Sequence, residues 1–97
     1  MRLHRYLEAP RDTTMAGVMP RYFFHVRGGP VEADDEEGCE LPDAAAAECY
    51  AVAAARELLA AAVIEGRLPL DERIDVNDAS GRRLLSLSFG EAVAAPR

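Results

Sequence analysis

Alternating apolar and polar side chains predict three strands in this chain. Residues 21–27 (RYFFHVR) are rich in aromatic and β-branched residues and run into a Gly-Gly-Pro turn at 28–30. Residues 73–77 and 83–89 alternate in the same way, and the D-A-S-G segment 78–81 between them favours a hairpin. The first strand carries apolar side chains on both faces, so we expect it to lie in the centre of the sheet or to be covered on both faces.

An Ala-rich segment with three-four spacing predicts one long helix over residues 44–65. Asp43 suits the N-cap because its carboxylate can accept hydrogen bonds from the free amides of the first turn, and Gly66 suits the C-cap. The predicted buried stripe consists of Ala44, Ala51, Val52, Ala55, Leu58, Leu59, Ala62 and Val63. A Ser-x-x-Glu capping box at 88–91 permits a short second helix over 91–95.

The order of these elements indicates an α+β fold. We predict a small β-α-β-β domain in which one long helix packs on one face of an antiparallel sheet of about three strands. Residues 19–97 form this domain. Residues 1–18 differ in composition and are predicted to be a loosely ordered extension, upstream of a true start at Met19. The alternative is an N-terminal helix that docks through Leu3, Tyr6 and Leu7.

The segment between the first strand and the long helix is strongly acidic, and we call residues 32–43 the acidic segment. We expect a solvated loop with at most a short pairing and a turn at Gly38. Its carboxylates can accept paired hydrogen bonds from guanidinium groups, which predicts a protein partner with a basic surface. The predicted partner-binding residues are Glu32, Asp34, Asp35, Glu36, Glu37 and Glu40. Calcium binding is an alternative, but the spacing does not match a calcium loop, so we predict no metal and no other cofactor.

Composition narrows the range of functions. The chain has 97 residues, and alanine makes up much of its 49% hydrophobic content, so the core is thin and leaves little room for a deep pocket. The net charge is -6, and all 11 basic residues apart from histidine are arginine, which is typical of a GC-rich bacterium. This negative charge argues against binding to nucleic acid or to anionic membranes. With neither a secretory signal nor a long apolar run, a cytoplasmic location is expected.

No set of residues resembles a catalytic site, so we predict that the chain is not an enzyme. His25 stands alone among aromatic residues, and a packed or hydrogen-bonded role explains it better than a general base. Cys39 and Cys49 form no CxxC pair and have no neighbouring base to activate a thiol. If the chain were an enzyme, a polar pocket near His25 would be expected.

The outer face of the long helix is a candidate dimer interface. Small side chains with one Tyr and one Ile could form a self-complementary contact, although Ala is equally suited to a solvated helix. The predicted residues of this face are Tyr50, Ala53, Ala54, Glu57, Ala61 and Ile64.

Four short motifs resemble a family of short bacterial proteins of unknown function that open with M-P-R-Y-F-F-H. They are MPRYFFHV at 19–26, GCELPD at 38–43, ARELL at 55–59 and DASGR at 78–82. This resemblance implies no reaction, cofactor or binding residue. The strand, acidic segment and L-P-D before a helix are also similar to HicB-type antitoxins, but no DNA-binding element follows.

These observations together predict a protein-interaction or regulatory module that docks through the acidic segment or a free sheet edge. The alternative is an antitoxin-like inhibitor of a basic toxin or nuclease.

Overall fold

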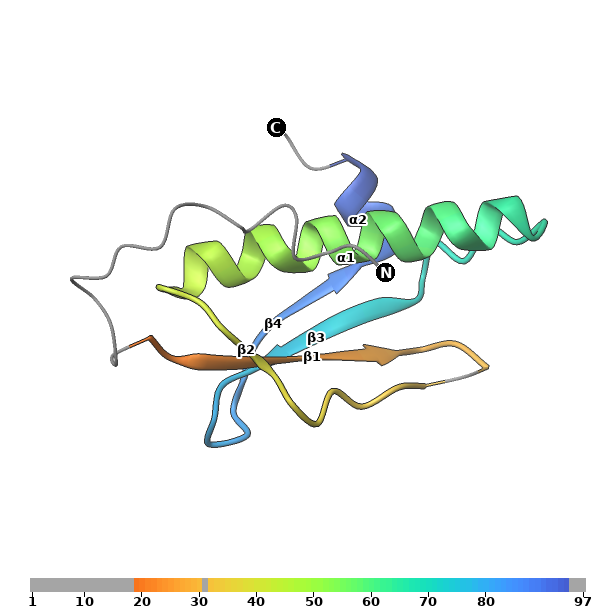
Figure 1. Cartoon of the computed structure of the whole chain (residues 1–97). Helices are drawn as coiled ribbons and strands as arrows, with labels where there is room; N and C mark the ends of the chain where they lie inside the picture. Colours follow the sequence, from red (N-terminus) through yellow and green to blue (C-terminus); the bar gives the residue numbers. More distant parts are fainter. Residues whose placement is uncertain (1–18, 31, 95–97) are drawn as a thin grey trace.

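The computed structural model describes residues 19–30 and 32–94 as a four-stranded antiparallel sheet with a long helix across one face (Figure 1). The elements are β1 (Arg21–Arg27), β2 (Cys39–Glu40), α1 (Ala44–Ile64), β3 (Arg73–Asn77), β4 (Arg83–Ser88) and α2 (Phe89–Ala94). The strand order is β2-β1-β3-β4, and every neighbouring pair is antiparallel. The predicted α+β class is confirmed. The predicted extension over residues 1–18 lies outside the described residues.

The sheet has one strand more than predicted. The additional strand, β2, pairs Cys39 with Tyr22 and Glu40 with Arg21. Two residues are too few to show a period of two, so the pattern of side chains carried no signal for this strand. Its presence puts β1 in the interior of the sheet, as the apolar side chains on both faces of that strand indicated. Of the two faces of β1, α1 covers only one (Figure 1).

Both helices begin at capping residues. The extended backbone of Asp43 lets its carboxylate accept a hydrogen bond from the Ala46 amide at 2.9 Å, which confirms the predicted N-cap of α1. At α2, Ser88 and Glu91 form the reciprocal capping box, with 2.9 Å and 3.0 Å between donor and acceptor atoms. Ser88 therefore ends β4 and α2 begins at Phe89. The sequence reading, which put Phe89 in the strand and started the helix at Glu91, was two residues late.

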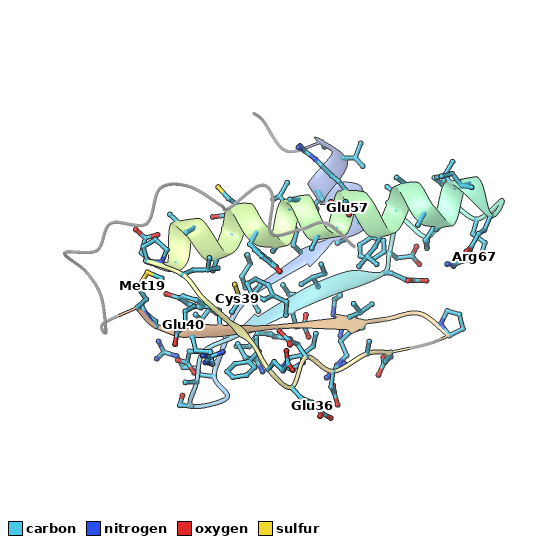
Figure 2. The ribbon with its side chains drawn as sticks, in the orientation of Figure 1. Met19, Glu36, Cys39, Glu40, Glu57 and Arg67 are labelled. Carbon is cyan, nitrogen blue, oxygen red and sulfur yellow. The ribbon has the colours of Figure 1, made fainter. Side chains whose placement is uncertain are left out.

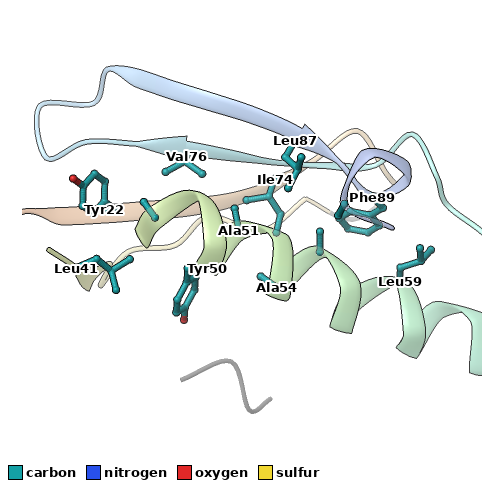
Figure 3. Packing of buried hydrophobic residues seen from close by; sticks show 13 residues of the cluster. Tyr22, Leu41, Tyr50, Ala51, Ala54, Leu59, Ile74, Val76, Leu87 and Phe89 are labelled. Atoms are coloured by element: carbon teal, nitrogen blue, oxygen red, sulfur yellow. The ribbon is translucent and has the colours of Figure 1, made fainter. Parts of the chain in front are cut away.

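The core lies between α1 and one face of the sheet (Figure 3). The buried residues of α1 are largely alanine, so the helix backbone can approach the sheet closely. The larger side chains come from the other elements, and those of Ile74, Val76 and Phe89 are fully buried. Phe89 belongs to α2, so this short helix closes one end of the core.

The buried stripe of α1 is rotated relative to the predicted one. Tyr50 and Ala54 are in the core, where the Tyr50 ring lies 4.5 Å from that of Phe24. Ala44 and Val63, which were predicted to be buried, are exposed. A helix of 21 residues is about 32 Å long, whereas the longest strand of seven residues spans about 23 Å. The end of α1 near Val63 therefore extends past the sheet (Figure 1), whereas Ala44 is exposed in the first turn, where it lines a shallow groove against β4.

Gly38 is required by the turn that leads into β2. Its φ is +73°, and a Cβ atom there would lie within 2.9 Å of atoms of Phe23, Arg21 and Tyr22. Gly81 also has a positive φ, of +90°, but its Cβ would meet no atom within 4 Å.

We predict that Gly38→Ala lowers the free energy of unfolding by about 3 kcal/mol, because it adds steric overlap to the cost of the left-handed backbone. The matched control Gly81→Ala has only the backbone cost of about 1 kcal/mol. Urea denaturation of both variants measures the difference. Equal losses would contradict the close packing of Gly38 against β1.

Candidate interaction surfaces

The acidic segment lies along the outer edge of β1 and is fastened to it by backbone hydrogen bonds. The amide of Val26 donates to the carbonyl of Ala33 at 2.8 Å, and the amide of Ala33 donates back at 3.1 Å. Together with β2, this bridge fastens the segment to both ends of β1. The prediction of a short pairing was correct, and most residues of the segment are exposed to solvent, as expected, although they are held along β1.

Asp35 holds the middle of the segment through its carboxylate. The amide of Phe24 donates to Oδ2 at 3.1 Å, and the amides of Gly38 and Glu37 donate to Oδ1 at 3.0 Å and 3.3 Å. The Asp35 amide donates to Nδ1 of His25 at 3.0 Å. Asp35 therefore takes the place of a strand residue opposite Phe24, and His25 serves as an acceptor in the same network.

Three other carboxylates of the segment are also occupied. Asp34 accepts a hydrogen bond from the guanidinium of Arg27, which lowers the pKa of this carboxyl below its usual value. Glu40 pairs with Arg21 at 2.9 Å, and Glu32 accepts from the amide of Gly28 at 3.2 Å.

Glu36 and Glu37 differ from the other four predicted partner-binding residues. Both are exposed, and neither side chain has a partner among the described residues. Figure 2 shows Glu36 and Glu40 at separate points along the segment. Within residues 19–30 and 32–94, no three carboxylate, His or Cys side chains gather as a metal site would require. Glu36 and Glu37 are thus available to pair with an outside partner, whereas Asp34 and Glu40 are exposed but already paired with arginines.

A shallow apolar groove lies between α1 and the edge of β1 that the acidic segment follows. Its volume is about 210 Å³, and we name it the β1–α1 groove. The groove is lined by Phe24, Val26, Asp35, Tyr50, Ala54, Leu58 and Ile74. It exists because β2 is too short to cover Phe24 and Val26 on the side of α1.

Carboxylates lie at the margins of this groove. Burial raises the pKa of Tyr50, and the nearby charges of Cys39, Asp35 and Glu57 raise it further. Glu57 lies two turns beyond Tyr50 on the same side of α1, and Asp35 approaches from the acidic segment. Glu36 and Glu37 follow Asp35 in the segment, and Figure 2 shows Glu36 on the side of β1 away from α1. The groove therefore combines an apolar floor with one carboxylate in its lining, that of Asp35, and another near Tyr50, that of Glu57.

The opposite face of the sheet is polar, and arginines gather on it. Arg21 and Arg27 of β1 lie on this face, as do Arg73 of β3 and Arg83 of β4. The sequence analysis missed this grouping, although Arg21, Arg27 and Arg73 all occupy the strand positions that alternate with the core residues. An acid accompanies each arginine, so this face holds ion pairs and no free basic patch.

Asp75 is the centre of this polar face. The residue is only 9% exposed, and it is the one buried charged residue of the described chain. Its Oδ1 accepts hydrogen bonds from the Ser86 hydroxyl at 2.7 Å and from Nε of Arg73 at 3.2 Å, and Arg83 lies at 3.8 Å from Oδ2. Burial alone would raise the pKa of Asp75, but these donors and charges lower it below its usual value.

The predicted dimer residues on α1 do not share an exposed face. Tyr50 and Ala54 are buried and line the β1–α1 groove, while Ala53 and Glu57 are half-buried. Ala61 is exposed and Ile64 is 86% exposed, because the helix end extends past the sheet. The assignment of Tyr50 and Ala54 to the outer face was wrong. The rotated stripe explains the error, since these two residues face Phe24 and the sheet.

The candidate catalytic side chains do not come together. Neither described groove is lined by His25, a cysteine or a serine. Both cysteines are free, and burial raises the pKa of the Cys39 thiol, which disfavours the reactive thiolate. Neither of these two grooves is the polar pocket near His25 that an enzyme would need.

The fold and its surfaces define a small α+β domain with a thin core, a polar outer sheet face and shallow apolar grooves. The chain belongs to the family described as "Domain of unknown function (DUF6894)", whose model matches residues 21–90. The comparisons with curated proteins and with solved structures gave no match. Among the described residues, neither helix has the length and apolar character needed to cross a membrane.

Asp75 makes stability depend on pH. A carboxyl with a lowered pKa in the folded state stabilises the fold above its unfolded pKa of about 3.8, and this contribution is lost as the pH falls through the folded pKa. We predict that Asp75→Asn lowers the free energy of unfolding by about 2 kcal/mol at neutral pH. The gap from the wild type should narrow below about pH 4.

Urea denaturation of both proteins between neutral pH and about pH 2 measures this gap. The other carboxyls with lowered pKa values, Asp34 and Asp78, are present in both proteins, so the difference isolates Asp75. A gap that stays constant down to the lowest pH would contradict the assigned charge network.

Proposed function

We propose that this chain is a cytoplasmic protein-interaction or regulatory module that binds a basic segment of a partner protein in the β1–α1 groove. The observation that carries the proposal is an apolar groove with the carboxylate of Asp35 in its lining and that of Glu57 near Tyr50. Protein interfaces typically place a buried apolar anchor in such a pocket and surround it with polar contacts.

The size of the groove favours a protein side chain over a metabolite. Sites for small molecules usually enclose about 300–1,000 Å³, whereas this groove holds about 210 Å³ and is open to solvent. Phe24 and Tyr50 supply an aromatic floor suited to an aliphatic or aromatic anchor. A single side chain of a partner fits this volume.

The charges around the groove define the rest of the partner. A segment that crosses the groove places its flanking residues near Glu57 on α1 and near the acidic segment, where Asp35 lines the groove and Glu36 and Glu37 follow it in the chain. Arginine or lysine at these flanks would meet carboxylates that are not already paired with a base. The net charge of -6 would also steer a basic partner toward this chain.

An antitoxin-like inhibitor is a second candidate, and the exposed Glu36 and Glu37 favour it. The same surface could mask the basic active-site region of a toxin or nuclease. The two functions differ in what happens when the gene is deleted, because only an antitoxin leaves behind a toxic neighbour. Growth of a deletion strain, with and without the neighbouring reading frame, discriminates between them.

Selection of displayed peptides against the full chain tests the proposed function. We predict that selected peptides share one large apolar residue flanked by Arg or Lys. Glu57→Arg should weaken their binding about tenfold, because it turns an attraction into a repulsion at the rim. Glu48→Arg is the matched control, since Glu48 lies on the same helix but lines a different groove.

Isothermal calorimetry with one selected peptide measures both variants. A second comparison uses Glu36→Gln with Glu37→Gln and leaves Asp35 intact, because loss of Asp35 would release the segment from β1. Equal weakening by Glu57→Arg and Glu48→Arg, or selected peptides without basic residues, would contradict the proposal.

A further inference from the structure

We propose that a second copy of this chain pairs with β4, so that two sheets join about a two-fold axis at Ser86. β4 stands at the end of the strand order, and no described strand pairs with its outer edge. The outer edge of β1, in contrast, is closed by the acidic segment. This surface is separate from the β1–α1 groove, so the inference does not depend on the proposed function.

The strand pairing identifies the free backbone groups of β4. Val26 exchanges both its hydrogen bonds with Ala33 on the outer edge of β1, so the residues of β1 that face β3 are Phe23, His25 and Arg27. Along β3 the backbone N–H and C=O groups of successive residues point alternately toward β1 and toward β4. Those of Ile74 and Val76 point toward Leu87 and Leu85 of β4. The N–H and C=O of Ser86, between these two, therefore point away from the sheet.

The middle of β4 lacks the features that usually protect an edge strand. Its start carries Arg83 and the irregular pairing, and the amide of Ser88 at its end already donates to Glu91 at 2.9 Å. Monomeric proteins block such edges with Lys, Pro or inward-pointing charges. From residue 84 to residue 88 the sequence is Leu-Leu-Ser-Leu-Ser, which contains none of these. The irregular pairing at Val76 and Asn77 affects only the start of β4, and the register is regular from Leu85 to Ser88.

Antiparallel pairing about Ser86 also brings opposite charges together. Ser86 then lies opposite Ser86 of the second copy, and Arg83 lies opposite Phe89, the first residue of α2. Arg82, whose side chain is 77% exposed, and Arg83 come near Glu91 in the first turn of the other α2. The two-fold axis repeats this contact, so each copy supplies both signs of charge.

Apolar surfaces meet in the same arrangement. A groove of about 110 Å³ lies between the start of α1 and β4, lined by Ala44, Ala47, Glu48, Val76, Leu84 and Leu85. α2 packs against α1 on the same side of the sheet, at the other end of β4 (Figure 1). Pairing about Ser86 carries the α2 of one copy to this groove of the other. Leu84 is 39% exposed and Val93 of α2 is 57% exposed, so both have apolar surface to bury.

Ser86→Pro tests this pairing on the full chain. Proline removes the outward N–H of Ser86 and leaves the hydrogen bonds between β3 and β4 in place, because proline is tolerated at solvent-facing positions of edge strands. It also removes the hydroxyl that bonds to Asp75, so Ser86→Ala is the matched control. The alanine variant loses the same hydroxyl but keeps the N–H.

Sedimentation equilibrium in a reducing buffer measures the mass, so that the two free cysteines cannot link the copies. We predict twice the chain mass of 10.5 kDa for the wild type and for Ser86→Ala, and the monomer mass for Ser86→Pro with an unchanged circular dichroism spectrum. A monomeric wild type, or a dimer that persists in a folded Ser86→Pro variant, would overturn the proposal.

A second variant keeps the test decisive if the proline variant does not fold. Arg82→Glu leaves the strand backbone intact, and it should raise the dissociation constant of the dimer about tenfold, because the lost attraction occurs twice. Added salt should reduce the difference in dissociation constant between the wild type and Arg82→Glu. An unchanged dissociation constant would overturn the proposed register.

Discussion

The carboxylate of Asp35 organises one whole side of this protein. Its two oxygens accept hydrogen bonds from the amides of Phe24, Glu37 and Gly38, which belong to β1 and to the acidic segment. A carboxylate that accepts from several amides compensates for its own desolvation and closes a sheet edge without a full strand. Gly38 completes the arrangement, since only glycine combines its backbone angle with contact against Phe23.

Three properties of the surface follow from this fastening. The edge of β1 is closed, so the edges of the described sheet are β4 and the two-residue β2, and β4 is the longer of them. The segment lies flat along β1 without filling the space beside α1, so the β1–α1 groove stays open. Four of its six predicted binding carboxylates are engaged within the chain, so Glu36 and Glu37 carry its outward charge. Much of the acidic composition thus serves the fold.

Much of the fold could be predicted from local signals. Alternation in residues 21–27, the Asp43 cap and the Ser-Gly turn before residue 83 each act within a few residues, and the structure confirms the elements they predicted. Predictions failed where distant residues decide the outcome. The two residues of β2 pair only because Asp35 and Gly38 hold the segment in place, and Tyr50 is buried because the ring of Phe24 lies against it.

For the candidate site, too, local features could be predicted from the sequence and contacts between distant residues could not. The sequence could identify the acidic segment as distinctive, because charge density is a local property. It could not show which carboxylates are occupied, since Arg27 lies seven residues from Asp34 and Arg21 lies 19 residues from Glu40. Both grooves also depend on how α1 is rotated over the sheet, which the alanine-rich pattern defines poorly.

Amide hydrogen exchange at Phe24 tests the central role of Asp35 most directly. No backbone carbonyl faces this amide in the described structure, and its acceptor is the Asp35 side chain. We predict that NMR-detected exchange of the Phe24 amide is slowed to the rate of its paired neighbours Tyr22 and Val26. Exchange as fast as that of the exposed Glu36 amide would contradict the account.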